Sequence, residues 1–433
     1  MKKILVSVGL AAVGTAGLHA AYAPDIGTMN ATKMWSVAGT LRGFYDDNYV
    51  TSSKARSSYG FEVSPSFNVD VPLQQTEIGL RYAYGLYYYQ DRDQRGQNPI
   101  DQTHEADLWL DHAFTERWQT RLEDSFRVGQ EPQLLTGSGA TAVPYRLEGD
   151  NIANNANVSL HTDWTRLFST ELTYQNGYYD YSESGTTEFD LLSGRAPSYA
   201  GLLNRDENSI ALDGQWHMEP TMMFLVGYKY EQVNYLGDEP IAFSALYPSG
   251  FAFSKDRDNR SQIGYVGTQW DILPNLSLAG KVGAQYTEDY NEPSSPSTFA
   301  PYVTSSLTYT YLPGDYVQIG FNQARNATDV YAPNAKGQVT LDQESSLVYA
   351  SINHKITPKL LGTLIGQLQY STFNGGLYNN DAETLYSLGL NLSYTFTPHL
   401  SADAGYNYDD LTSDIGGRGY SRNRVYIGLT AAY

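Results

Sequence analysis

Apolar and polar residues alternate with a period of two along most of the chain. Every second residue from Ile78 to Tyr88 and from Tyr386 to Phe396 is apolar, and small or polar residues lie between them. Successive side chains of a strand point to opposite faces, so each segment has one apolar and one polar face. Many segments run about 10–16 residues, longer than the ~5–6 of soluble strands and long enough to cross a bilayer when tilted. A sheet in lipid must close on itself. The pattern predicts an all-β fold, a transmembrane antiparallel up-and-down β-barrel.

The connections between these segments alternate between short and long. Eight short ones, many with Pro or Gly, fall at 71–74, 115–116, 163–165, 219–220, 273–275, 312–315, 357–359 and 397–399. Nine longer polar ones fall at 46–56, 91–103, 129–151, 184–206, 235–257, 289–297, 327–342, 374–381 and 410–420. Seventeen connections predict eighteen strands, within two, over residues 34–433, with both ends of the barrel on the short-turn side. Bacterial outer-membrane barrels pair short periplasmic turns with long outer loops in this way.

The N-terminus has the pattern of a secretory signal peptide. Basic residues at Lys2 and Lys3 precede an apolar stretch, and small residues follow at Ala20, Ala21 and Ala23. We expect residues 1–20 to be removed, because a cut after Ala23, the alternative, would place a proline next to the cleavage site. Residues 21–33 would then form a short periplasmic segment before the barrel.

Composition narrows the class further. The 433 residues include 37 Tyr and no Cys, only 17% are charged, and the net charge is −19. A mean hydropathy of −0.42 and the lack of any mature apolar run near 18 residues exclude an α-helical membrane protein. The acidic balance argues against nucleic acid, which is bound through Lys and Arg. The absence of Cys excludes disulfides and thiolate sites.

Short motifs resemble one known family. The run Phe44-Tyr45-Asp46-Asp47-Asn48 closes the first predicted strand, Ser64-Pro65-Ser66-Phe67 lies in the second, and Tyr420-Ser421-Arg422-Asn423-Arg424 opens the last. Together they resemble the β-barrel porin type 2 family of Gram-negative outer membranes. The resemblance spans about 34–433 and implies a porin in the cell outer membrane, but it supplies no functional residues.

The last strand carries a candidate assembly signal. Val425, Ile427, Leu429, Ala431 and Tyr433 share one face, and the aromatic residue is terminal. We expect Tyr433, with Gly428 five residues before it, to be recognised by the barrel-assembly machinery.

No catalytic or metal-binding pattern is present. The sequence has no HExxH pair, no G-x-S-x-G and no Gly-rich phosphate loop. The spacing Asp91-x-Asp93-x-x-Gly96 lacks the closing bidentate Glu of a calcium loop, which favours a solvated loop. We therefore expect no enzyme activity, no cofactor and no metal.

Charged residues on the polar faces are the candidates for a pore lining. The main set is Arg42, Glu62, Glu77, Arg81, Glu105, Asp107, Asp111, Arg121, Glu123, Arg127, Asp213, Lys229, Glu231, Lys281 and Asp403. Asp70, Asp163, Glu171, Asp271, Asp409, Lys355, Arg422 and Arg424 share these faces, which makes fourteen acids and nine bases. The excess of acids predicts a modest preference for cations.

Two of the charge pairs can be predicted in detail. If the strands on either side of Thr115-Glu116 pair about that turn, opposite residue numbers sum to 232. Asp111 then faces Arg121, and Glu105 faces Arg127. Such pairs either stiffen the wall or set up a transverse field that selects dipolar solutes.

Outward tyrosines are expected at the membrane interfaces, where aromatic girdles form. They are Tyr45, Tyr88, Tyr286, Tyr370 and Tyr394.

The function that fits best is an outer-membrane porin for passive diffusion of small hydrophilic solutes. Its other partners would be outer-membrane lipid and lipopolysaccharide, and the sequence leaves a monomer and a trimer both open. An exopolysaccharide secretion conduit and a structural or adhesive surface barrel are the alternatives. Eighteen strands enclose a wide lumen, so we expect something to narrow it. The loop 129–151 either folds inward to do so or stands in solvent.

Overall fold

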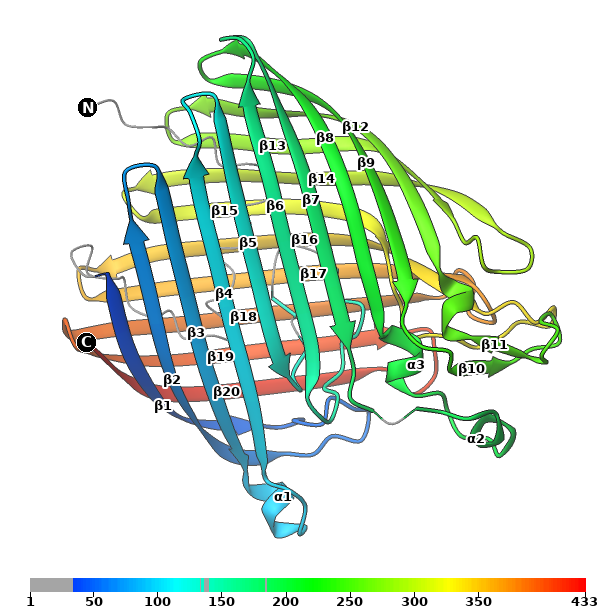
Figure 1. The fold of residues 1–433 in the computed structure, drawn as a ribbon. Helices are drawn as coiled ribbons and strands as arrows, with labels where there is room; N and C mark the ends of the chain where they lie inside the picture. The colour runs from blue at the N-terminus through cyan, green and yellow to red at the C-terminus, as the bar shows by residue number, and fades with distance from the viewer. Residues whose placement is uncertain (1–33, 133, 136–139, 184) are drawn as a thin grey trace.

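The chain forms one closed barrel, seen in a computed structural model that describes residues 34–132, 134–135, 140–183 and 185–433 (Figure 1). Eighteen strands make a single antiparallel sheet. The first strand, β1 (Trp35–Asp46), pairs with the last, β20 (Tyr420–Ala432), as well as with the second. The predicted fold and strand number are confirmed. The predicted signal peptide and periplasmic segment lie outside the described residues.

Long strands account for nearly the whole barrel. The first half consists of β1, β2 (Ser58–Pro72), β3 (Thr76–Tyr89), β4 (Ile100–Ala113), β5 (Trp118–Gly129), β6 (Asn151–Asp163), β7 (Phe168–Asp180), β8 (Arg205–Glu219) and β9 (Met222–Tyr235). The second half consists of β12 (Asn259–Leu273), β13 (Leu276–Glu288), β14 (Ser297–Leu312), β15 (Asp315–Asn326), β16 (Thr340–Thr357), β17 (Leu360–Gly375), β18 (Ala382–Thr397), β19 (Leu400–Ser413) and β20. All eight short and nine long connections fall between the strands where the sequence predicts them.

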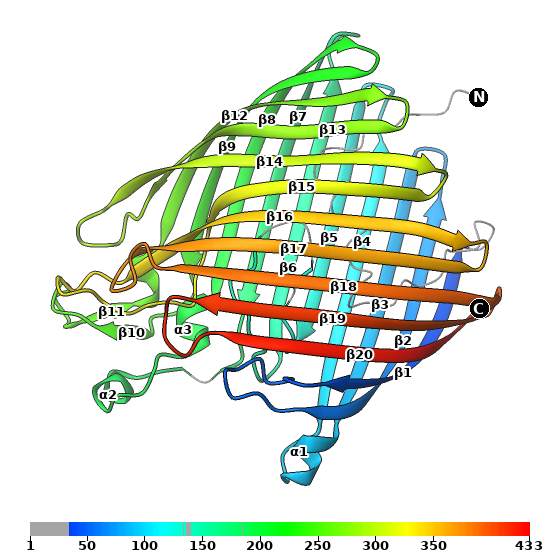
Figure 2. The ribbon, with the colours of Figure 1, turned by 180° about the vertical axis from the view of Figure 1, so that it is seen from behind.

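The long connections carry the remaining regular structure, and they all lie at one end of the barrel (Figures 1 and 2). We call this the loop end and the opposite end the turn end. The elements are α1 (Gln90–Gln94), α2 (Glu188–Leu192), α3 (Tyr199–Leu203), a 3-10 turn (Ser254–Arg257) and a hairpin of β10 (Pro240–Phe243) and β11 (Phe251–Phe253). Across the described ranges, no helix has the length and apolar character to span a membrane.

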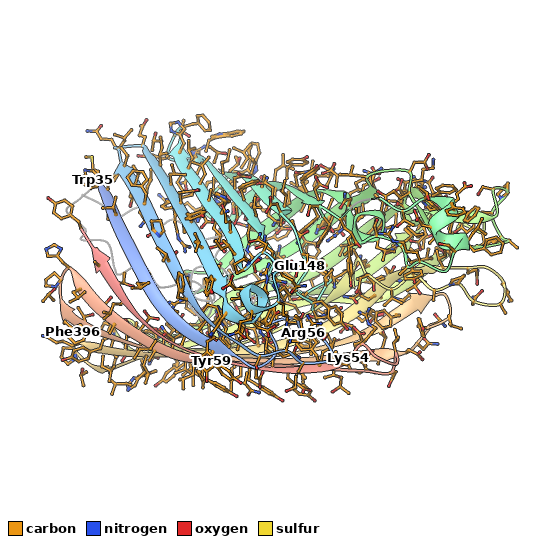
Figure 3. The ribbon with its side chains drawn as sticks, turned by 90° about the horizontal axis from the view of Figure 1, so that it is seen from below. Trp35, Lys54, Arg56, Tyr59, Glu148 and Phe396 are labelled. Atoms are coloured by element: carbon orange, nitrogen blue, oxygen red, sulfur yellow. The ribbon has the colours of Figure 1, made fainter. Side chains whose placement is uncertain are left out.

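The two faces of the sheet differ as the alternation predicts, and side chains project from both of them (Figure 3). Leu41, Ile210 and Leu390 are exposed on the outside, whereas their polar neighbours Arg42, Ser209 and Asn391 are buried inside. The tyrosines predicted for the interfaces lie towards the strand ends. Tyr45 packs against Tyr59 at the loop end, with ring centroids 4.8 Å apart, and Tyr394 contacts Phe396 at the turn end.

The seam between β1 and β20 is made by backbone and side-chain bonds. Thr40 and Thr430 hydroxyls lie 2.8 Å apart inside the barrel, and the backbone N–H of Tyr433 donates to the carbonyl of Val37 at 2.9 Å. Gly428 lies opposite both Arg42 and Asp403. A Cβ at Gly428 would lie 3.0 Å from Asp403 Oδ1, so the glycine makes room for the ion pair beside it.

We expect Tyr433→Asp to lower the amount of barrel in the outer membrane several-fold. The ring of Tyr433 packs 5.8 Å from that of Trp35 across the seam, and a carboxylate there would remove the terminal aromatic of the predicted assembly signal. Immunoblotting of outer-membrane fractions measures the effect. Tyr433→Phe is the control and should insert normally. Equal yields of the Asp and Phe variants would show that the assembly machinery does not recognise the terminal aromatic residue.

Candidate pore constriction

The connection between β5 and β6 crosses the lumen. We call residues 130–150 the crossing loop. Among its described residues, Leu135 packs on Tyr349 of β16 and Ile365 of β17, and the backbone N–H of Thr141 donates to Gln369 Oε1 at 2.7 Å. Seven strands separate β5 and β6 from β16 and β17 in either direction around the barrel. The loop therefore reaches the opposite wall, which supports the inward alternative and contradicts a loop standing in solvent.

Apolar contacts fix this loop against the far wall. Leu134 is buried with Leu385, Leu411 and Tyr420, which belong to β18, β19 and β20. The Tyr420 hydroxyl donates to the carbonyl of Pro144 at 2.6 Å. Burying a leucine side chain contributes roughly 1.5–3 kcal/mol, so these contacts oppose release of the loop.

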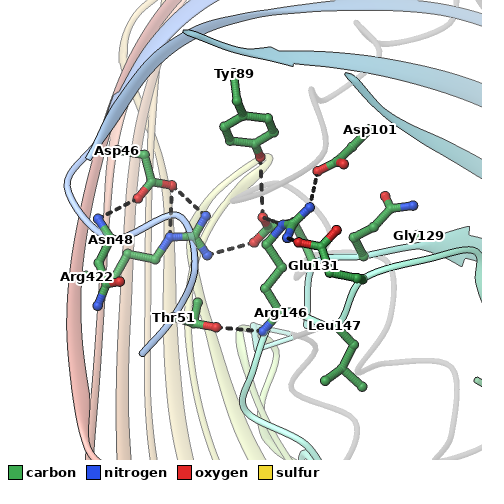
Figure 4. Close-up of polar contacts among 12 residues, drawn as sticks. Asp46, Asn48, Thr51, Tyr89, Asp101, Gly129, Glu131, Arg146, Leu147 and Arg422 are labelled. Atoms are coloured by element: carbon green, nitrogen blue, oxygen red, sulfur yellow. Dashed lines mark hydrogen bonds and ion pairs between the residues drawn. The ribbon is translucent and has the colours of Figure 1, made fainter. Parts of the chain in front are cut away.

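A buried ionic network, shown in Figure 4, joins the loop to the barrel seam; we call it the latch. Arg422 of β20 lies 2.6 Å from Asp46 of β1 and 2.7 Å from Glu131 of the loop. Arg146 of the loop lies 2.6 Å from Asp101 of β4 and 3.5 Å from Glu131. The side chains of Arg422, Asp46 and Arg146 are at most 2% exposed. Because each charge is paired, the network tolerates burial that a lone ion would not.

Glu131 is the centre of the latch and stays ionised. Burial raises its pKa, but the positive charges of Arg422, Arg146 and Arg424 outweigh that effect and lower the pKa from 4.5 to about 2. The Tyr89 hydroxyl also donates to Glu131, at 3.4 Å. The carboxylate therefore holds two arginines from different elements at ordinary pH.

Other long connections pack over the crossing loop. Val143 and Leu147 join a buried cluster with residues of three further connections and with Leu341 at the start of β16. Its other members are Leu202, Leu203, Ile241, Ala242, Tyr247, Ala252, Val339 and Leu341. The crossing loop thus lies between the barrel wall and a layer of loops, which narrows the mouth at the loop end.

The predicted pore-lining residues gather in six groups, and strand parity places them on the inner face. The ion-paired groups are Arg42 with Glu62 and Asp403, Arg81 with Asp107, Arg121 with Asp111 and Glu123, Arg127 with Glu105, Lys229 with Glu231, and Lys281 with Asp213. Glu77 lies directly opposite Asp111 across β3 and β4 and is exposed.

The predicted register of β4 and β5 is confirmed. Asp111 pairs with Arg121 and Glu105 with Arg127, and the shortest ion-pair distances are 3.8 and 3.3 Å. The side chains of these four residues are between 18 and 35% exposed. We use the name open wall for the charged residues on the inner face of β3 to β5 that are at least partly exposed, which are Glu77, Arg81, Glu105, Asp107, Asp111, Arg121, Glu123 and Arg127. Arg127 also donates to the carbonyl of Glu131 at 3.0 Å, next to the root of the loop.

The latch contains residues that the pore-lining candidates omitted. Asp46 and Asp101 lie at strand ends, in segments that the sequence predicted to be loops. Glu131 and Arg146 lie in a loop whose apolar and polar residues do not alternate, so strand parity could not place them. The signal that could have identified them is the apolar content of that loop, since Leu134, Leu135, Val143 and Leu147 need a surface to cover them. No cluster with the geometry of a metal site occurs among the described residues.

We expect Arg422→Leu to destabilise the barrel by about 3–5 kcal/mol, because it leaves Asp46 and Glu131 buried without their partner. Equilibrium unfolding in denaturant, followed in lipid or detergent, measures the change. Arg260→Leu is the matched control. Arg260 lies 2.9 Å from Glu288, but its side chain is 46% exposed, and an exposed pair contributes about 0–1 kcal/mol. If both variants lower the free energy of unfolding by a similar amount, the proposed stabilising role of the latch is contradicted.

The latch should also respond to acid. A carboxyl group whose pKa is lowered on folding stabilises the native contact above its ordinary pKa, and that contribution is lost as the pH falls towards the folded value. For Glu131 this window runs from 4.5 down to about 2. Single-channel conductance should be constant between pH 7 and 5 and rise below 4.5, and Glu131→Gln should remove the rise. A rise between pH 7 and 5 would disprove this assignment.

Comparisons with known proteins identify a family for this chain. The family model described as "Putative beta-barrel porin 2" matches residues 36–433. Pseudomonas aeruginosa OccK1 (OpdK) is 8% identical with a TM-score of 0.45, and the match covers 92% of this chain and 99% of that one. Acinetobacter baumannii OccAB4 is 12% identical with a TM-score of 0.43, over 94% and 100%. No curated protein matches. The chain belongs to the family of outer-membrane β-barrel porins whose model covers it from residue 36 to its last residue.

Proposed function

We propose that the protein is a porin through which small hydrophilic solutes diffuse passively, at a width set by the crossing loop. The observation that carries the proposal is the loop's span from β5 to the opposite wall, where Thr141 bonds Gln369. An eighteen-stranded barrel encloses more space than its wall side chains fill. A folded segment inside it is then what decides which solutes pass.

The open wall supplies the charge that solutes meet. Arg81, Arg121 and Arg127 alternate there with Glu105, Asp107, Asp111 and Glu123, and Glu77 adds a further acid. Ion pairs at this exposure attract each other weakly and remain available to solvent. A wall with more acids than bases accumulates cations near it, which supports a mild cation preference.

The two alternative functions make different demands on the lumen. A conduit for an exopolysaccharide needs a wide continuous passage, and the crossing loop, held by the latch and by Leu134, obstructs one. A structural or adhesive barrel needs no passage at all. Conductance in planar bilayers separates this last function from a porin, because only the porin gives stable open-channel steps.

Deleting residues 134–144 should raise single-channel conductance and admit larger sugars in liposome swelling. The deletion removes the contacts to β16, β17 and β18 that hold the loop across the lumen. Deleting residues 188–194 is the matched control, because α2 projects away from the barrel with Phe189 77% exposed (Figure 1). An inserted barrel whose conductance is unchanged by the first deletion would rule out the loop as the constriction.

The charge of the lumen should appear in the reversal potential under a salt gradient. We expect a modest preference for potassium over chloride. Replacing Glu77, Asp107 and Glu123 with Gln should shift the potential towards anions, because it removes three acids from the open wall. Anion preference in the wild-type protein would contradict the proposed selectivity.

A further inference from the structure

Trp109 is a tryptophan on the inner face of the barrel. It lies on β4 and shares its parity with Asp107 and Asp111 of the open wall, and its side chain is partly exposed. The chain has six tryptophans. Four of the others point outward by strand parity and one lies in a short turn, and all five are exposed: Trp35, Trp118, Trp164, Trp216 and Trp270. Those positions suit the aromatic girdle of a membrane barrel, which does not account for an indole among lumen charges.

The indole of Trp109 lies flat against the neighbouring strand. Gly79 of β3 is directly opposite Trp109 in the strand register. A Cβ at Gly79 would lie 1.8 Å from Cε2, 1.9 Å from Cζ2 and 2.4 Å from Nε1 of the indole, so only a glycine lets the ring come this close to the backbone. One face of the indole therefore rests on the wall, and the other face is turned towards the lumen.

The lumen face of this ring has no partner within the described part of the chain. Two other aromatic rings of the inner wall are each covered by a cation. Arg205 Cζ lies 4.0 Å from the ring centroid of Tyr179, and Lys281 Nζ lies 4.7 Å from that of Tyr265. Across the same described ranges, Trp109 contacts no cation and no second ring, and its indole N–H forms no hydrogen bond. The ring is therefore free to contact a solute.

Charged side chains of both signs surround the indole. Arg81 and Asp107, 3.4 Å apart, lie one register row towards the loop end. Arg121 and Asp111, 3.8 Å apart, lie one row towards the turn end. Glu123 is directly opposite the indole on β5. These five side chains are between 21 and 31% exposed. The edge of the ring thus has hydrogen-bond donors and acceptors beside it that solvent reaches.

We propose that Trp109 and the charged side chains around it bind the ring of a neutral sugar on its way through the pore, a site that rests on the proposed porin function. The face of an aromatic ring carries negative charge, and the C–H groups on one face of a pyranose are slightly positive, so the two stack. Hydroxyl groups at the edge of the sugar both donate and accept hydrogen bonds. The carboxylates and guanidinium groups of the wall supply charged partners, which strengthen such bonds.

An organic cation is the competing occupant, because an aromatic face also attracts positive charge. A cation can use only the acceptors of the wall. Arg81 and Arg121 flank the ring and repel it, and they already engage Asp107 and Glu123, at 3.4 and 2.5 Å. A neutral solute with many hydroxyl groups uses donors and acceptors alike and leaves those ion pairs intact. The arrangement therefore favours a sugar.

Two neutral disaccharides, maltose and cellobiose, are the probes for single channels in planar bilayers. At least one should reduce the open-channel current of the wild-type protein in a saturable way. Trp109→Leu fills the space over Gly79 without a flat ring and should weaken that block about tenfold, whereas Trp109→Tyr keeps a ring and should stay within about threefold. Trp118→Leu removes an outward tryptophan of β5 and is the matched control, which should be blocked like the wild type.

Two outcomes of this experiment would overturn the proposal. Equal losses in the Leu and Tyr variants would mean that Trp109 only fills space beside Gly79. A block by choline, with none by either disaccharide, would assign the ring to a cation.

Cysteine labelling tests the site with Trp109 in place, and it decides the question if the Leu variant fails to insert. The sequence has no Cys. Ser125 of β5 is exposed and lies opposite Asp107, one row from the indole. The disaccharide that blocks the channel, or either one if neither does, should slow labelling of Ser125→Cys by a water-soluble maleimide. Ser306→Cys, on the inner face of β14, is the control and should react at an unchanged rate.

The labelling result also separates this site from the porin function. Open-channel steps without block by sugar and without protection of Ser125→Cys would leave the porin function standing and overturn the sugar site. Equal protection at both cysteines would overturn it as well. Selective protection in a barrel that never opens would refute the porin function and support the site.

Discussion

The pairing of β1 with β20 is the interaction on which the rest of the structure depends. Inside a bilayer no water is available to bond an exposed strand edge, so the sheet has to join its own ends. That pairing brings together residues as far apart in sequence as Thr40 and Thr430. It also sets the circumference, because eighteen strands of fixed spacing enclose a lumen wider than their side chains fill. The crossing loop and the layer of loops above it occupy space that this closure creates.

Two classes of ion pair follow from that geometry. The pairs of the latch are almost completely buried, and their arginines join elements that are distant in sequence, so they hold the loop in position. The pairs of the open wall are part exposed and join neighbouring strands, as Arg127 and Glu105 do. The side chains of the second class are partly exposed to solvent, whereas those of the latch are not. The difference is one of burial and not of residue type.

The barrel could be predicted from the sequence because its rules are local. Alternation over ten or more residues, and the short turns between the segments, specify strand number and register, down to the opposition of Asp111 and Arg121. The crossing loop could not be placed in the same way. Its contacts, such as Leu135 with Ile365, join segments far apart in the chain, and the loops at 184–206 and 235–257 are as long.

Arg422 couples the closure of the barrel to the position of the crossing loop. It lies on β20, which closes the sheet on β1, and it contacts both β1, at Asp46, and the crossing loop, at Glu131. One side chain therefore joins the final closure of the sheet to the seating of the loop. A change that weakens the seam at this residue would therefore also loosen the segment that lies across the lumen.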